Sequence, residues 1–84
     1  MYGIRLATVA PILARAVFLN SIFGKNGAIK GICLQIQKAC LENDIAMVKA
    51  LLKTIASQDI EAFAEMEKVM RETLSDEEWR ELVK

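Results

Sequence analysis

The side chains that could carry out chemistry in this chain are few, and histidine is missing from all 84 positions. Its absence removes the commonest general base and the commonest ligand of transition metals. Four acidic side chains stand close enough in sequence to suggest a carboxylate metal site: Glu61, Glu65, Glu67 and Glu72. Helical bundles build such sites from inward-pointing glutamates together with histidines, whereas these glutamates fall on the polar side of a predicted helix. We therefore expect no metal, no cofactor and no enzymatic activity.

The other reactive groups are two thiols, Cys33 and Cys40, which lie seven residues apart on one helical stripe. A helix rises 1.5 Å per residue, so the two residues stand about 10 Å apart along the axis. That separation is too long for a disulfide within one helix. We expect both cysteines to be small, buried core residues, and unpaired thiols are typical of a reducing compartment such as the cytoplasm.

The stretch that positions both thiols is a predicted pair of helices over residues 29–55. Apolar residues recur there at three- and four-residue steps, which forms one apolar stripe on each helix. The stripes are Ile29, Ile32, Cys33, Ile36, Ala39 and Cys40, then Ile45, Val48, Leu51, Leu52 and Ile55. The polar turn between the helices is short, so they should be antiparallel neighbours, with Asn43 or Asp44 capping the second.

The apolar spacing as a whole predicts an all-α fold, a small bundle of four to five short helices built on this central antiparallel αα-hairpin. A chain of this length forms a single domain, residues 1–84. Pro11 lacks the backbone N–H that a helix interior needs, so it starts or kinks the first helix and leaves residues 1–9 as an N-terminal arm. The predicted helices run near 10–23, 28–42, 44–56, 59–74 and 76–83.

The last two predicted helices have clear start signals. Ser57 or Asp59 can cap the fourth helix, and Ser75 with Glu78 has the spacing of a capping box for the fifth. The predicted apolar face of the fourth helix consists of Ile60, Phe63, Met66, Val69, Met70 and Leu74.

Charge is divided between the two halves of the sequence although the formal net charge is +0. The first 41 residues carry five cations and no acidic residue, and all 11 acidic residues follow, together with six cations. One interpretation is that the halves pack together and cancel. The alternatives are head-to-tail self-association and a basic patch for an anionic partner.

Gly24-Lys25-Asn26-Gly27 is the clearest break between predicted helices and spells GxxG. The motif resembles the GxxG loop of KH domains, which clamps a nucleic-acid backbone. That resemblance implies nucleic-acid contact by the loop and by polar and basic residues in and near it, namely Arg15, Lys25, Asn26 and Lys30. The segment after the second helix predicts another helix where a KH domain has strands, so a purely structural turn is the other interpretation.

The segment 1–23 is the most apolar part of the chain, with Arg5, Thr8 and Arg15 on one narrow side of a helix. A helix that is apolar almost all round is central in a bundle, shared at an oligomer interface, or in lipid. Arg15 would sit near the middle of a membrane span at a cost of about 3 kcal/mol. We expect a buried helix, with peripheral membrane association through it as a further alternative.

Hydrophobic residues make up 54% of the chain, and its mean hydropathy is +0.26, which is high for so small a protein. This high content of apolar residues predicts a non-catalytic protein-protein interaction or regulatory module that self-associates, with a dimer as the expected oligomer. Tryptophan is enriched at interface hot spots, although a lone one can also cover its own core. The contact residues we expect are Ile12, Phe18, Phe23, Trp79 and Leu82. Nucleic-acid binding through residues 24–30 is the alternative function.

Overall fold

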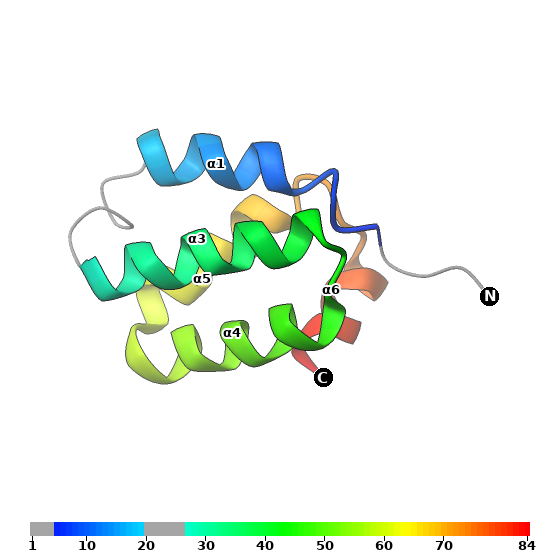
Figure 1. Ribbon diagram of the computed structural model, residues 1–84. Helices are drawn as coiled ribbons and strands as arrows, with labels where there is room; N and C mark the ends of the chain where they lie inside the picture. The colour runs from blue at the N-terminus through cyan, green and yellow to red at the C-terminus, as the bar shows by residue number, and fades with distance from the viewer. Residues whose placement is uncertain (1–4, 20–26) are drawn as a thin grey trace.

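A computed structural model describes residues 5–19 and 27–84, with the backbone only for residues 17–19. The regular structure in these ranges is helical, which confirms the predicted all-α bundle. The helices are α1 (Ala10–Leu19), α3 (Gly27–Leu41), α4 (Ile45–Gln58), α5 (Ile60–Met70) and α6 (Asp76–Val83) (Figure 1).

Helices α1, α3 and α4 lie side by side, each antiparallel to the next, with α5 behind them (Figure 1). Helix α3 packs against α1 and α4, α5 contacts both α1 and α4, and α6 packs against α4. The radius of gyration is 11.5 Å, close to the value of about 12 Å for a compact chain of this length. The predicted antiparallel hairpin, α3 and α4, is therefore the centre of the bundle.

The turn of this hairpin depends on Asn43, whose φ of 53° is the one left-handed non-glycine backbone among the described residues. The N–H of Asn43 donates to the Cys40 carbonyl at 3.0 Å, and the N–H of Asp44 donates to the Ala39 carbonyl at 2.8 Å. This pair of bonds is a Schellman motif, which satisfies the last carbonyls of α3. Asp44 then caps α4 by accepting the N–H of Met47.

Residues 5–9, which belong to the predicted N-terminal arm, contribute to the core of their own chain. Leu6 and Val9 are fully buried, and the N–H of Val9 donates to the Leu6 carbonyl at 2.9 Å in a tight turn. Helix α1 begins at Ala10, as the position of Pro11 predicted. Pro11 stands in the first turn, where its missing N–H removes no bond inside the helix.

The cap signals of the last two helices are confirmed. The Asp59 carboxylate accepts the N–H groups of Glu61 and Ala62, both at 3.1 Å. The Ser75 hydroxyl accepts the N–H of Glu78, and the Glu78 carboxylate accepts the N–H of Ser75, which completes the capping box.

The predicted helix over 59–74 was too long, because α5 ends at Met70. The N–H groups of Thr73 and Leu74 both donate to the Met70 carbonyl, so the last turn tightens before the cap of α6. Arg71 spans this turn, since its guanidinium pairs with Glu67 on α5 and with Asp76 on α6.

The core is entirely apolar, since the described residues include no buried polar or charged side chain. On α3 and α4 its residues are those of the predicted stripes, including both cysteines. On α5 the prediction was partly wrong, because Ile60 is 67% exposed and Ala62 is buried. Ile60 is the first residue of α5 and lies 200° around the helix from Ala62, so it faces away from the core. The buried residues of α5 are Ala62, Met66, Val69 and Met70.

Candidate interaction surface

The residues predicted to make apolar contacts fall in different environments. Trp79 and Leu82 are 5% and 0% exposed, so both serve the core of their own chain, and the Trp79 ring lies 5.9 Å from that of Phe63. Ile12 is half-buried against the same core. Phe18 belongs to α1 in a part described by its backbone alone, and Phe23 lies outside the described residues.

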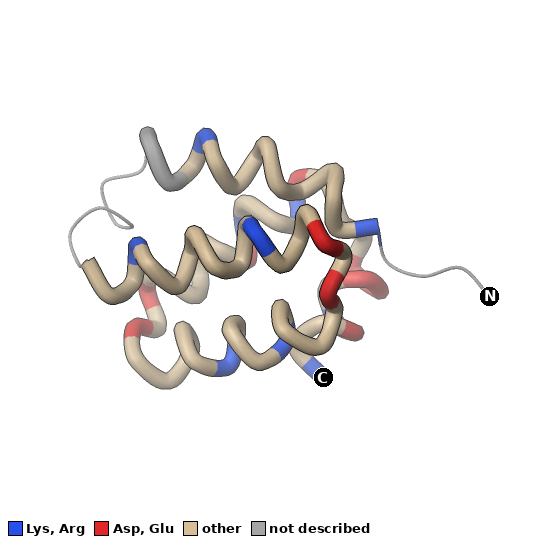
Figure 2. The backbone as a smooth tube through the Cα atoms, in the orientation of Figure 1, with Lys and Arg blue, Asp and Glu red and all other residues tan. Residues whose placement is uncertain are grey.

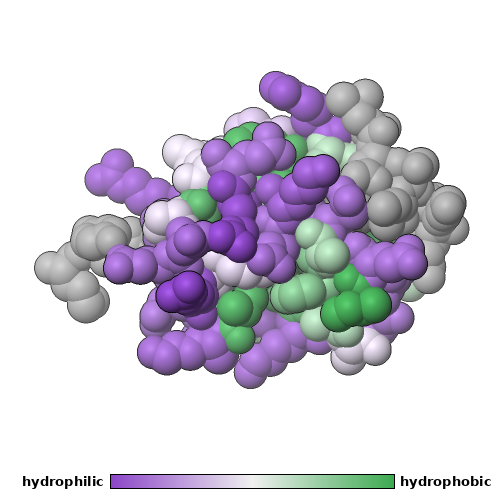
Figure 3. Space-filling model, turned by 180° about the vertical axis from the view of Figure 1, so that it is seen from behind, coloured by the Kyte–Doolittle hydropathy of each residue, from purple (hydrophilic) through white to green (hydrophobic). Residues whose placement is uncertain are grey.

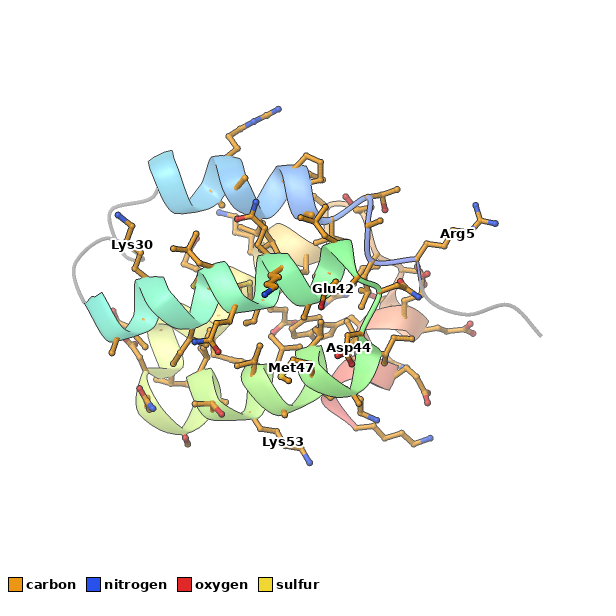
Figure 4. The ribbon with its side chains drawn as sticks, in the orientation of Figure 1. Arg5, Lys30, Glu42, Asp44, Met47 and Lys53 are labelled. Carbon is orange, nitrogen blue, oxygen red and sulfur yellow. The ribbon has the colours of Figure 1, made fainter. Side chains whose placement is uncertain are left out.

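The predicted anion-binding residues are described only in part. Arg15 and Lys30 are exposed, whereas Lys25 and Asn26 lie outside the described residues. The end of α1 and the start of α3 lie at the same end of the bundle (Figure 1), and Lys30 stands in the first turn of α3, whereas Arg15 is in the middle of α1. Arg5 lies at the opposite end from Lys30 (Figure 4).

The charges of the two halves are divided along the chain. Every charged residue before Glu42, on α1, on α3 and in the segments beside them, is basic. The acidic residues all stand from Glu42 onward (Figure 2). The halves do pack together, α3 on α4 and α1 on α5, as one interpretation of the sequence required. However, the ion pairs among the described residues all join members of the C-terminal half: Arg71 with Glu67 and Asp76, and Lys84 with Glu81. The described cations of the N-terminal half therefore face solvent without an ion-pair partner in the described part of the chain.

A small apolar cleft of about 100 Å³ opens between α4, α5 and α6. Its floor is formed by Leu52 and Leu82, which are almost fully buried. We call this site the apolar cleft, and its lining residues are Leu52, Lys53, Ala56, Phe63, Leu82 and Val83.

Exposed apolar side chains adjoin the apolar cleft. Ile60, at 67% exposure, stands four residues after Ala56 and three before Phe63, and Val83 on α6 is 38% exposed. Figure 3, in which the molecule is seen from behind, shows apolar side chains gathered where α4 passes into α5. Sequence reasoning placed Ile60 in the core and missed this patch. The available signal was the Asp59 cap, which makes Ile60 the first helical residue and sets the face it occupies.

A second hollow, of about 310 Å³, lies between the end of α3 and the start of α4. Glu42, Asp44 and Met47 lie close together beside it (Figure 4). Its lining is mixed in charge, since Lys38 on α3 stands with Glu42 and Asp44, and the neutral Gln35 also contributes. One carboxylate oxygen of Asp44 already accepts the N–H of Met47 and caps α4, so that oxygen has a structural role.

The two thiols are free and fully buried, as the sequence predicted. Burial raises the pKa of Cys33 and that of Cys40 from 9.0 to about 11, because an apolar environment disfavours the thiolate. A thiol held neutral in this way is a poor nucleophile at neutral pH. Within residues 5–19 and 27–84, no three metal-binding side chains come together in a group that could hold a metal ion.

None of the helices in the described part of the chain combines the length and the apolar character needed to cross a membrane. Comparison with models of protein families, with curated proteins and with solved structures finds no match to this chain.

Proposed function

We propose that this chain is a non-catalytic helical interaction module that self-associates through the apolar cleft and the exposed residues beside it. The observation that carries the proposal is the position of Ile60, a large aliphatic side chain that is 67% exposed beside a cleft with an apolar floor. Scattered apolar residues are normal on a protein surface, but an apolar hollow with an exposed apolar rim favours a protein contact.

The composition supports the same proposal. The chain is rich in apolar residues, and its described core is filled without any buried polar side chain. Apolar residues that the core does not accommodate remain at the surface, where contact with a partner removes them from water. The lack of histidine and the neutral, buried thiols favour a binding role over a catalytic one.

The test is the absolute mass of the protein in solution, measured by light scattering after size exclusion over a range of protein concentrations and at moderate and high salt. We expect a dimer that persists at high salt, because apolar contacts are not screened by ions whereas surface ion pairs are. A monomer at every concentration would refute self-association. A dimer that dissociates at high salt would indicate that the contact is made by the charged surfaces and not by the apolar cleft.

A second candidate function is the binding of single-stranded nucleic acid at the end of the bundle where α1 ends and α3 begins. Arg15 and Lys30 favour it, since both are exposed and neither has an ion-pair partner among the described residues. Cations of this kind release counterions from phosphates, so the affinity should fall steeply with salt.

A fluorescence anisotropy titration with a labelled oligonucleotide tests this second candidate. The Lys25→Glu, Lys30→Glu variant should lose binding, whereas Lys68→Glu, a change of one exposed lysine on α5, should lose much less. Equal binding by all three proteins would reject this function.

A further inference from the structure

The backbone at Ile60 is held in place, although most of the Ile60 side chain is in solvent. It is the first residue of α5, directly after Asp59, whose carboxylate accepts the N–H groups of Glu61 and Ala62 at 3.1 Å. The cap fixes the backbone on both sides of the isoleucine. Because the backbone there is already ordered, a contact through Ile60 requires no further backbone ordering, so the residue is suited to act as an anchor in a protein contact.

The apolar cleft has the size to receive one such anchor. Its volume of about 100 Å³ is below that of a cavity of about 150 Å³, which holds benzene, and well below the roughly 300–1,000 Å³ of small-molecule sites. Leu52 and Leu82 form an apolar floor, and Phe63 and Val83 form its walls. The site therefore fits a single branched aliphatic side chain.

The charges beside Ile60 and beside the apolar cleft are opposite in sign. Ile60 lies between two carboxylates, Asp59 and Glu61, whereas the rim of the cleft carries Lys53. Glu61 and Lys53 are both exposed, and neither has an ion-pair partner among the described residues. An isoleucine next to a free carboxylate is thus complementary to an apolar cleft beside a free lysine.

We infer that the apolar cleft receives Ile60 of a second copy of this chain, in a symmetric dimer in which Glu61 of each copy faces Lys53 of the other. The inference rests on the proposed self-association and names its partner and its contact. Ile60 and the cleft share one surface, because Ala56 and Phe63 lie within four residues of Ile60. A contact of a surface with its own copy closes on itself, so the assembly stops at two chains.

The first test substitutes the anchor. Ile60→Asp should raise the dissociation constant of the dimer by about tenfold or more, measured by sedimentation equilibrium, with an unchanged helical circular dichroism spectrum. The matched control is Leu41→Asp, the same change at another exposed position, 60% exposed on α3, which should leave the dimer intact. A dimer that tolerates Ile60→Asp and is lost with Leu41→Asp would overturn the inference and leave self-association standing.

The second test exchanges the charges. Lys53→Glu and Glu61→Lys should each weaken the dimer, and the double variant should regain most of the lost affinity because the pair is restored with its sign reversed. Additive losses in the double variant would show that the two side chains do not meet. A wild-type chain that stays monomeric throughout would remove the proposed function itself, which separates that failure from the failure of this contact.

Discussion

The Asn43 side chain accepts the backbone N–H of Leu6 at 2.9 Å, across 37 residues of sequence. Asn43 is also the left-handed residue that ends α3, so one side chain joins the turn of the central hairpin to the segment before α1. The Leu6 side chain is fully buried, so the backbone N–H of Leu6 lies next to the core. Asn43 supplies the acceptor that this N–H needs. The hydrogen bond therefore fixes the position of the N-terminal segment relative to the hairpin.

Replacing Asn43 separates these two roles. Asn43→Gly keeps the left-handed backbone and loses the acceptor, so we expect a loss of about 1 kcal/mol in the free energy of unfolding. Asn43→Ala loses the acceptor and adds about 1–2 kcal/mol of backbone strain, so it should be the less stable variant. Guanidinium unfolding gives the order, and hydrogen exchange should show faster exchange of the Leu6 amide in both. Equal stability of the two variants would contradict the role of the backbone.

The capping box at the start of α6 should have a measurable effect on stability. Ser75→Ala removes the acceptor of the Glu78 N–H, and we expect it to lower the free energy of unfolding by about 1 kcal/mol. The matched control is Ser57→Ala in the last turn of α4, where the hydroxyl donates to the Thr54 carbonyl and is exposed. That change should stay within about 0.5 kcal/mol. Thermal unfolding of the two variants side by side provides the comparison, and similar losses would count against a special role of the cap.

Leucines in different environments should respond differently to truncation. Leu13 on α1 is fully buried, whereas Leu41 at the end of α3 is 60% exposed. Leu13→Ala should cost about 2–5 kcal/mol, since it removes apolar contacts and leaves a cavity, and Leu41→Ala should cost less than about 0.5 kcal/mol. Urea unfolding measures both. A small effect at Leu13 would show that α1 is not packed on the core as described.

Stability should fall in mildly alkaline solution because of the buried thiols. The pKa of Cys33 and of Cys40 is raised from 9.0 to about 11, so the unfolded chain ionises them first and binds fewer protons between these values. The thiols therefore contribute no pH dependence below about pH 9, and the free energy of unfolding falls as the pH rises further, by at most about 1.4 kcal/mol per pH unit and thiol.

Unfolding at about pH 8 and about pH 10 in the presence of reductant measures this slope. The Cys33→Ala, Cys40→Ala variant is the control, because it keeps every other group that titrates in this range. Its stability should decrease less between the two pH values than that of the parent chain. Identical decreases would show that the thiols do not cause the pH dependence.

The sequence carried enough information for the local parts of the fold. Asp59, Ser75 and Glu78 act on backbone groups within three residues, so their types and spacing predicted the caps. The apolar stripes of α3 and α4 were predicted for the same reason, since the helical period alone decides which residues share a face.

The features that were missed depend on where distant segments meet. Nothing near Asn43 in the sequence indicates Leu6 as its partner, because that bond exists only after α1 has packed on α3. Ile60 looked like a core residue because it is aliphatic and three residues from Phe63. Its exposure follows from the exact start of α5 and from the direction in which α5 lies on α1 and α4, and helix ends are the least predictable part of a helix.

The exposed cations of α1 and α3 have no ion-pair partner among the described residues, although the formal net charge of the chain is +0. Such charges attract the opposite charges of an approaching molecule before contact, so copies and partners meet in preferred orientations. Ions screen that alignment over a distance of about 10 Å at moderate ionic strength. Encounters should therefore be slower and less oriented in concentrated salt, even where the final contact is apolar and the affinity hardly changes.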